Sequence, residues 1–141
     1  MNQEDIKALY LILFILDASL LSILFFQSSE LSRYDSIYIT CILCSHFLLF
    51  LSLRNKWYQM IDVLHYVLFL SIVISIFIQN IFLQSLVLFL LFIIQLLWVY
   101  KQRCIMNTCK SKHFWGYSSH ITSFTIFYTI LLSIKFGKDL Y

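Results

Sequence analysis

The sequence predicts an all-α protein, a polytopic bundle of four to five transmembrane helices that forms a single domain over residues 1–141. Hydrophobic residues make up 61% of the chain and charged residues only 12%, with a mean hydropathy of +0.85. A small soluble domain cannot bury this much apolar surface, because folding leaves a large fraction of a short chain exposed. The chain also has no proline and only two glycines, so its apolar runs contain few helix breakers.

A helix needs about 20 apolar residues to cross the roughly 30 Å hydrocarbon core of a bilayer. By this measure the expected spans cover residues 9–26, 36–53, 60–78, 83–100 and 119–134. Transmembrane barrels require strands in which apolar and polar residues alternate, and these runs do not alternate. A helix satisfies its backbone hydrogen bonds within the segment, so each span is expected to be helical.

The boundary between the third and fourth spans is the least marked. Residues 57–103 contain no glycine or proline, and as one helix they would be about 70 Å long, too long for a single crossing. The polar cluster of Gln79, Asn80 and Gln84 therefore predicts a tight turn between two spans.

The fifth span is short and rich in serine and threonine, and Lys135 and Lys138 follow it. We expect it to cross the membrane, with an interfacial or partly inserted helix as the alternative. Two pairs of small residues at helical spacing, Ala18/Ser22 and Ser71/Ser75, are the expected points of close helix contact, within the bundle or with a partner. The acidic residues before the first span argue against a cleavable signal peptide.

The loop charges predict the orientation, since Lys and Arg are enriched in short loops on the cytoplasmic side. Basic residues gather in the loops after the second and fourth spans: Arg54, Lys56, Lys101, Arg103, Lys110 and Lys112. The loop between the first two spans carries Glu30 and Asp35 against Arg33. Trp57 and Trp98 border the basic loops, as interfacial tryptophans do. We expect the N-terminus on the cytoplasmic (or matrix) side of a membrane that the sequence does not identify.

Ionisable side chains within the spans are candidates for a functional site, because hydrocarbon penalises them strongly. These candidates are Asp17, His46, Asp62 and His65, and Gln95 adds a neutral polar group. At about 1.5 Å of rise per residue, Asp17, His46 and His65 have similar depths in the inner half of the membrane. Asp62 and His65 are three residues apart and share a helix face. We expect Asp17 to face the bundle interior, within reach of His46 or His65 directly or through water.

Three interpretations of this intramembrane polar cluster stay open. The side chains can join helices by hydrogen bonds, which contribute about 0.6 kcal/mol each on average in membranes. Alternatively, Asp17 and the Asp62–His65 pair could form a proton or ion pathway. A third interpretation is that His46 and His65 ligate a haem from neighbouring helices.

Cys41 and Cys44 form a Cys-x-x-Cys motif near the outer end of the second span. This spacing can make a redox dithiol, because a neighbouring thiol and a helix terminus favour the reactive thiolate. The motif and its position resemble the membrane thiol oxidases of the DsbB type and their vitamin K epoxide reductase relatives. That resemblance implies a four-helix bundle that passes electrons from a second cysteine pair to a quinone. The alternative is that both cysteines are small apolar helix residues.

The sequence departs from this family in two respects. Ser45-His46-Phe47 follows the motif where the DsbB type has an aromatic residue, Glu or Gln, and Arg. The second pair, Cys104 and Cys109, lies in a basic loop that we expect on the opposite side of the membrane. Together with His113 this pair could supply three zinc ligands, although the spacing is not that of a zinc knuckle.

No glycine-rich phosphate loop, nucleophile elbow or regular arginine ladder occurs in the sequence. We therefore expect neither enzymatic activity nor a nucleic-acid partner. The leading expectation is a structural or accessory membrane subunit without a cofactor, in contact with lipid and with other membrane proteins or a second copy. Two alternatives are a small membrane redox protein, using the dithiol with a quinone or a bis-histidine haem, and a proton-linked carrier or channel subunit.

Overall fold

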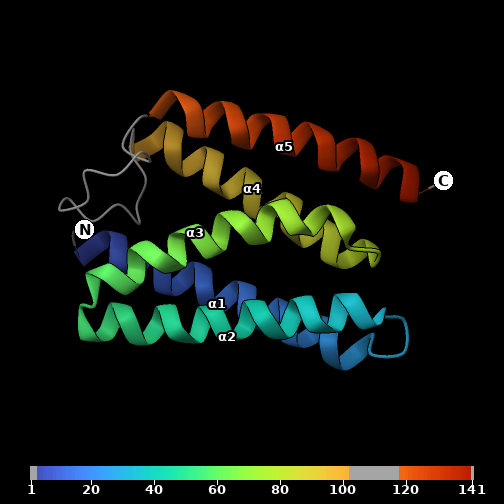
Figure 1. Cartoon of the computed structure of the whole chain (residues 1–141), viewed down its shortest axis with the longest axis horizontal. Coiled ribbons are helices and arrows are strands. Elements are labelled where there is room, and N and C mark those ends of the chain that lie inside the picture. Colours follow the sequence, from blue (N-terminus) through green and yellow to red (C-terminus); the bar gives the residue numbers. More distant parts are fainter. Residues whose placement is uncertain (1–2, 102–117, 141) are drawn as a thin grey trace.

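The computed structural model describes residues 3–101 and 118–140, and its regular structure there is entirely helical (Figure 1). The helices are α1 (Gln3–Phe26), α2 (Arg33–Asn55), α3 (Tyr58–Ile74), the short 3-10 helix η1 (Ser75–Phe77), α4 (Ile81–Lys101) and α5 (Ser118–Asp139). No strand occurs among the described residues. The expected all-α fold class is confirmed, and each long helix overlaps one of the five expected spans.

The long helices lie side by side, and the chain reverses at each described connection (Figure 1). The N-terminus and the α2–α3 connection lie at one end of the bundle. The α1–α2 loop, the α3–α4 turn and the C-terminus lie at the other. Helix α1 packs against α2 and α4, α2 packs against α3, and α4 packs against α5. Below, the two ends are called the N-terminal end and the C-terminal end of the bundle.

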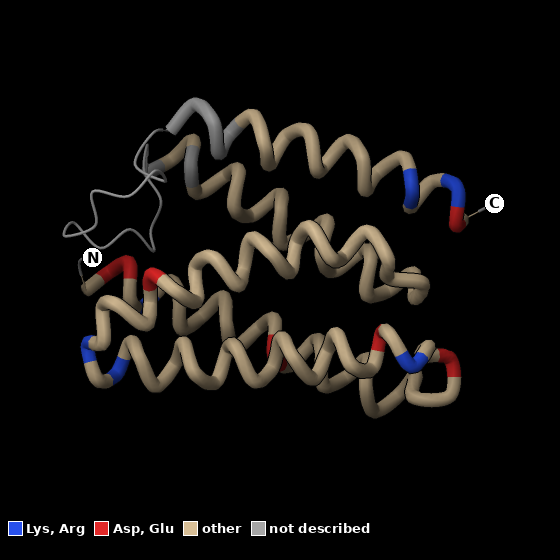
Figure 2. The backbone as a smooth tube through the Cα atoms, in the orientation of Figure 1, with Lys and Arg blue, Asp and Glu red and all other residues tan. Residues whose placement is uncertain are grey.

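Three described segments are long and apolar enough to cross a membrane: Gln3–Phe26, Arg33–Asn55 and Tyr58–Phe77. The apolar part of α4, Ile81–Leu97, is shorter. Charged residues gather towards the two ends of the bundle, and its middle is almost free of them (Figure 2). These features are compatible with a small membrane protein. The number of crossings, and the crossing by α5 above all, stays a prediction.

The core consists of two apolar clusters. The cluster towards the C-terminal end contains Leu20, Ile39, Ile72, Ile78, Leu83, Val87, Leu91, Tyr128 and Leu132. The cluster towards the N-terminal end contains Leu9, Leu13, Leu49, Leu53, Ile61 and Leu64. The outward faces are apolar as well, with large exposed side chains such as Phe14, Phe25 and Phe127. Helices that are apolar on all sides are typical of membrane spans.

The reversal between α2 and α3 requires an unusual backbone conformation at Lys56. This residue adopts the left-handed region with φ of 57°, and its N–H donates to the Leu53 carbonyl at 3.4 Å. The N–H of Trp57 then reaches the Ser52 carbonyl at 2.9 Å. Helices commonly end in this way, although glycine is the usual residue in the left-handed position.

Asp35 joins the start of α2 to the turn between α3 and α4. Its carboxylate is fully buried and accepts the backbone N–H of Gln79 at 3.1 Å and of Asn80 at 3.2 Å. The Ser32 hydroxyl donates to the same carboxylate at 2.9 Å and accepts the Asp35 N–H at 3.1 Å, which caps α2. One side chain therefore satisfies donors from two connections.

Asn80 caps α4 and fixes the position of the turn. Its side-chain oxygen accepts the N–H groups of Phe82 and Leu83 at 3.1 and 3.0 Å. Its amide nitrogen donates to Gln27 in the α1–α2 loop at 3.2 Å. The turn thus comprises residues 78–80, and the expectation that Gln84 belongs to it is wrong, because Asn80 starts the helix before that residue.

Helix α5 is attached to the same end of the bundle through Lys135 and Asp139. The Lys135 ammonium donates to the Ile78 carbonyl at 2.6 Å and to the Asp139 carboxylate at 2.7 Å. Gln84 donates to Asp139 at 2.6 Å and to Ile78 at 3.0 Å. The hydrogen bonds from Lys135 and Gln84 hold the pKa of Asp139, which lies beyond the expected fifth span, below its usual range. Lys135, which follows the expected fifth span, therefore has partners in the bundle.

Tyrosine hydroxyl groups complete the hydrogen bonding near the end of α3. They donate to the carbonyl oxygens of its last turn: Tyr34 to Ile74 at 3.0 Å, Tyr38 to Ser71 at 3.2 Å and Tyr128 to Val73 at 2.7 Å. The last carbonyl groups of a helix have few partners within the helix, and in hydrocarbon they need partners from neighbouring helices. α2 and α5 supply them here.

The first prediction concerns Asp35. Replacement by Ala removes the acceptor of two turn N–H groups, and we expect it to lower the free energy of unfolding by about 1.5–3 kcal/mol, the range for hydrogen bonds to charged groups. Asp35→Asn keeps one acceptor oxygen and should lie between Ala and wild type. The matched control is Glu30→Ala in the exposed α1–α2 loop. Thermal unfolding in detergent, followed by circular dichroism, measures the effect; equal midpoints for Asp35→Ala and Glu30→Ala would contradict it.

Candidate functional site: an aspartate–histidine pair beside an internal cavity

Asp17 and His46 form a hydrogen bond between the middle of α1 and α2. The Asp17 Oδ1 and His46 Nδ1 atoms are 2.6 Å apart. The contact that the sequence predicted for Asp17 is therefore present, and it is direct. For His46 to donate, Nδ1 must carry a proton, which leaves Nε2 of the neutral ring as a hydrogen-bond acceptor.

The two members of the pair differ in burial. The His46 side chain is 9% exposed, whereas that of Asp17 is 36% exposed. Asp17 lies at the boundary of α1, between the buried face of Leu13, Leu16 and Leu20 and the exposed face of Phe14 and Leu21. A carboxylate near the middle of the longest apolar helix is thus covered on one side only.

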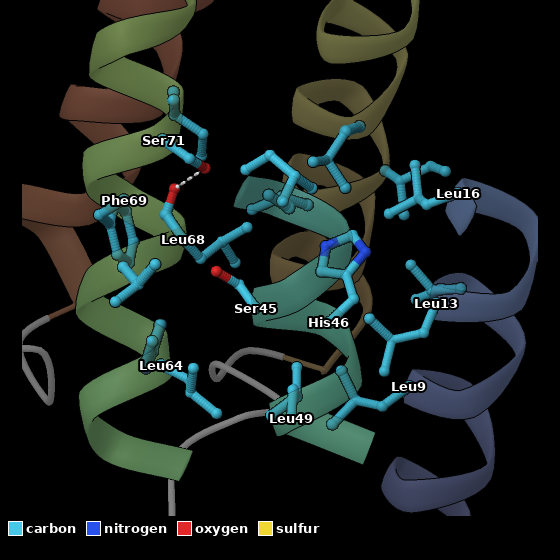
Figure 3. Close-up of a pocket in the computed structure, with 18 of the residues that line it drawn as sticks. Leu9, Leu13, Leu16, Ser45, His46, Leu49, Leu64, Leu68, Phe69 and Ser71 are labelled. Carbon is cyan, nitrogen blue, oxygen red and sulfur yellow. Dashed lines mark hydrogen bonds between the residues drawn. The ribbon is translucent and has the colours of Figure 1, made fainter. Parts of the chain in front are cut away.

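His46 and His65 line one cavity of about 100 Å³ between α1, α2, α3 and α4 (Figure 3). Most of its walls are leucine and isoleucine side chains, such as Leu9, Leu13 and Leu64. Its polar lining consists of Ser45, His46, His65 and Ser71. We call this the large cavity.

His65 is buried on α3 and stacks on Phe69, with ring centroids 5.2 Å apart. Asp62 is half-buried one turn earlier on the same helix. Of the three residues that the depth count brought together, His46 and His65 line the large cavity, and Asp17 is hydrogen-bonded to His46.

A smaller cavity of about 30 Å³ lies towards the C-terminal end of the bundle. Tyr38, His46 and Ser71 are its polar lining, and apolar residues of α1, α2, α3 and α4 complete it. His46 and Ser71 line both cavities. His46 therefore borders both cavities and is also hydrogen-bonded to the Asp17 carboxylate.

Gln95 lies apart from this cluster, and its inclusion in the sequence-based set is wrong. Its Nε2 donates to the Thr129 hydroxyl at 2.7 Å, so it joins α4 to α5. Similar depth places two residues in the same slice of a bundle, but the rotation of each helix decides whether they meet.

Cys41 and Cys44 are free and exposed on the outer face of α2. The described residues contain no group of three or more His, Cys, Asp or Glu side chains that could hold a metal ion. The hypothetical zinc ligands Cys104, Cys109 and His113 lie outside the residues that the structure describes.

Sequence reasoning missed two residues beside the site, Tyr38 and Asp35. Asp35 was interpreted only as a loop charge, and Tyr38 was not a site candidate. Their spacing carried a signal, because Asp35, Tyr38, Ile42 and His46 follow each other at intervals of three or four residues and so share one face of α2.

The second prediction measures the Asp17–His46 coupling. In a double-mutant cycle of Asp17→Asn and His46→Gln, we expect a coupling energy of about 0.6–1.7 kcal/mol, the range found for hydrogen bonds between membrane helices. Unfolding in mixed micelles with increasing dodecyl sulfate provides the free energies. The control cycle pairs Asp17→Asn with Gln95→Leu, which should be additive. Additivity in both cycles would mean that the pair does not form in the folded protein.

Comparisons of the chain with protein-family models, with curated proteins and with solved structures give no match. The site must therefore be interpreted from its own geometry.

Proposed function

We propose that this chain is a multi-pass integral membrane protein that serves as a structural or accessory subunit. It packs against lipid and against another membrane protein, and the side of α1 that carries Asp17 forms the contact with that protein. The observation that carries this proposal is the incomplete cover of the Asp17 carboxylate, which is hydrogen-bonded to His46 and still 36% exposed.

Energy considerations support a partner at this position. An aspartate at the centre of a membrane helix costs about 2.5–3.5 kcal/mol on insertion scales. His46 offsets part of that cost from within the bundle, and the exposed side of Asp17 can accept further hydrogen bonds. The complementary partner is a transmembrane helix with a donor such as Lys, Arg or an amide side chain.

The small-residue pairs do not mark the side of α1 that carries Asp17. Ser71 and Ser75 are buried and contribute to contacts within the bundle. Ala18 and Ser22 are exposed, but they lie roughly 100° and 140° around α1 from Asp17, on the side of Ile15. The contact proposed at Asp17 therefore rests on the carboxylate and not on these small residues.

The two redox alternatives have less support from the described geometry. A cavity of about 100 Å³ is small beside the about 300–1,000 Å³ of typical ligand sites, and a haem belongs at the large end of that range. This size favours hydrogen bonding over haem ligation for His46 and His65. The redox dithiol of Cys41 and Cys44, with a quinone as acceptor, stays a prediction. For the dithiol we expect that replacing both cysteines by Ala leaves expression and assembly nearly intact.

The third prediction concerns orientation. The basic residues Arg54 and Lys56 favour the N-terminal end of the bundle as the cytoplasmic (or matrix) side. Single cysteines at Ser29 and at Asn55, in a cysteine-free background, should then react with an impermeant maleimide from opposite sides. We expect Ser29→Cys to label in intact cells and Asn55→Cys only after permeabilisation. The reverse pattern would invert the orientation, and labelling of both from one side would mean that α2 does not cross.

The fourth prediction tests the subunit contact. A photo-crosslinking amino acid at Leu21, one turn after Asp17, should capture a membrane protein when the chain is expressed in its native membrane. The matched control is the same probe at Ile15, which is also exposed but two residues from Asp17 and so on nearly the opposite side of α1. Asp17→Ala should reduce capture from Leu21 and leave the Ile15 products unchanged.

Three outcomes of this experiment would count against the proposal. Lipid adducts alone at both positions would mean that α1 faces only the bilayer. An adduct of twice the chain's mass, formed also by the purified protein in vesicles, would identify a second copy as the partner. Capture from Leu21 that does not depend on Asp17 would leave the carboxylate without the proposed role.

A further inference from the structure

We propose that the bundle contains a proton pathway along its axis, with the His46 imidazole as the relay between the large and the small cavity. This inference concerns the interior of the bundle, and it shares the Asp17–His46 pair with the accessory-subunit proposal, which concerns the outer face of α1. The transported species is the proton, carried by water and by side chains in the cavities.

The large cavity can hold water. A water molecule takes up about 30 Å³ in the liquid, so a cavity of about 100 Å³ has room for several. Purely apolar cavities stay dry, and a buried water needs two to four polar partners. Ser45, His46, His65 and Ser71 supply such partners here, since imidazole nitrogens and hydroxyl oxygens can both accept hydrogen bonds.

Asp62 and His65 connect this cavity to the N-terminal end of the bundle. Asp62 lies in the second turn of α3, close to the start of the helix at Tyr58, and is half-buried. His65 follows one turn deeper and lines the large cavity. A carboxylate near the surface followed by an imidazole is an arrangement that can take up a proton from solvent and pass it inward.

The relay step balances at His46 without a change of tautomer. Nε2 accepts a proton from water in the large cavity, and the imidazolium that forms keeps its Nδ1 proton in the hydrogen bond to the Asp17 carboxylate 2.6 Å away. The imidazolium then releases a proton from Nε2 to water in the small cavity, which His46 also lines, so the neutral ring with its proton on Nδ1 is restored. The titratable side chains that line the two cavities, among the described residues, are His46, His65 and Tyr38. Asp17 of α1 is hydrogen-bonded to His46, and α4 contributes apolar side chains to both cavities.

Polar groups continue towards the C-terminal end on one face of α2. The small cavity of about 30 Å³ has room for one water, next to Tyr38, His46 and Ser71. The Tyr38 hydroxyl donates to the Ser71 carbonyl, and its oxygen can accept a hydrogen bond from that water. Asp35 lies one turn beyond Tyr38 and belongs to the network that closes this end of the bundle.

The fifth prediction is a proton-flux measurement on the full chain in vesicles of phosphatidylcholine and phosphatidylglycerol. The vesicles contain a pH-sensitive dye, and a potassium gradient with valinomycin drives protons across. We expect the luminal pH to change faster in vesicles that contain the wild-type protein than in protein-free vesicles under the same gradient. His46→Gln retains a hydrogen-bonding side chain of similar size but cannot carry a proton, so it should lose this flux entirely.

Two further variants keep the test decisive. Cys44→Ala changes an exposed residue of α2 outside both cavities and should conduct like wild type. Leu90→Phe enlarges a side chain that lines both cavities, and it should block the flux even if His46→Gln fails to fold. Wild-type flux no higher than that of empty vesicles, or unchanged flux in folded His46→Gln or Leu90→Phe, would overturn the pathway. The photo-crosslinking result at Leu21 does not depend on any of these outcomes.

Discussion

In hydrocarbon a polar group has no water to bond with, so each one must find its partner within the protein. The helix contacts of this bundle follow from that constraint. Asp35 accepts N–H groups from the α3–α4 turn, and Gln95 of α4 donates to Thr129 of α5. In the middle of the bundle, Asp17 of α1 pairs with His46 of α2. Apolar side chains fill the space between helices, but they also cover the outer faces, so the polar pairs specify which faces meet.

The same constraint explains why the sequence predicted the helices well and their ends less well. Long apolar runs identify the spans, because only a helix can carry them through a bilayer. The ends depend on individual hydrogen bonds such as the Ser32 and Asn80 caps, which lengthen α2 and α4 beyond the apolar runs. Gln84 was assigned to the turn for its polarity, although it serves as a helical residue that bonds Ile78 and Asp139.

The sequence predicted the contacts of the site correctly where similar depth in the membrane was enough to bring two side chains together. Asp17 and His46 lie on neighbouring antiparallel helices, so similar depth brought them together. Depth failed for Gln95, because the rotation of α4 turns it towards α5. The two cavities could not be predicted, since a cavity depends on how side chains from four helices fail to fill the space between them. Asp17 thus serves two proposals, with its exposed side available to a partner helix and its buried side facing the relay at His46.

The account depends most on the Asp17–His46 hydrogen bond in lipid. The most direct measurement is ¹⁵N magic-angle-spinning NMR of the histidine-labelled protein in bilayers, with His46 assigned by the loss of its signals in His46→Gln. We expect His46 to show a protonated, strongly hydrogen-bonded Nδ1 whose resonance moves in Asp17→Asn, while the other histidines keep theirs. A His46 spectrum that is identical in wild type and Asp17→Asn would contradict the account.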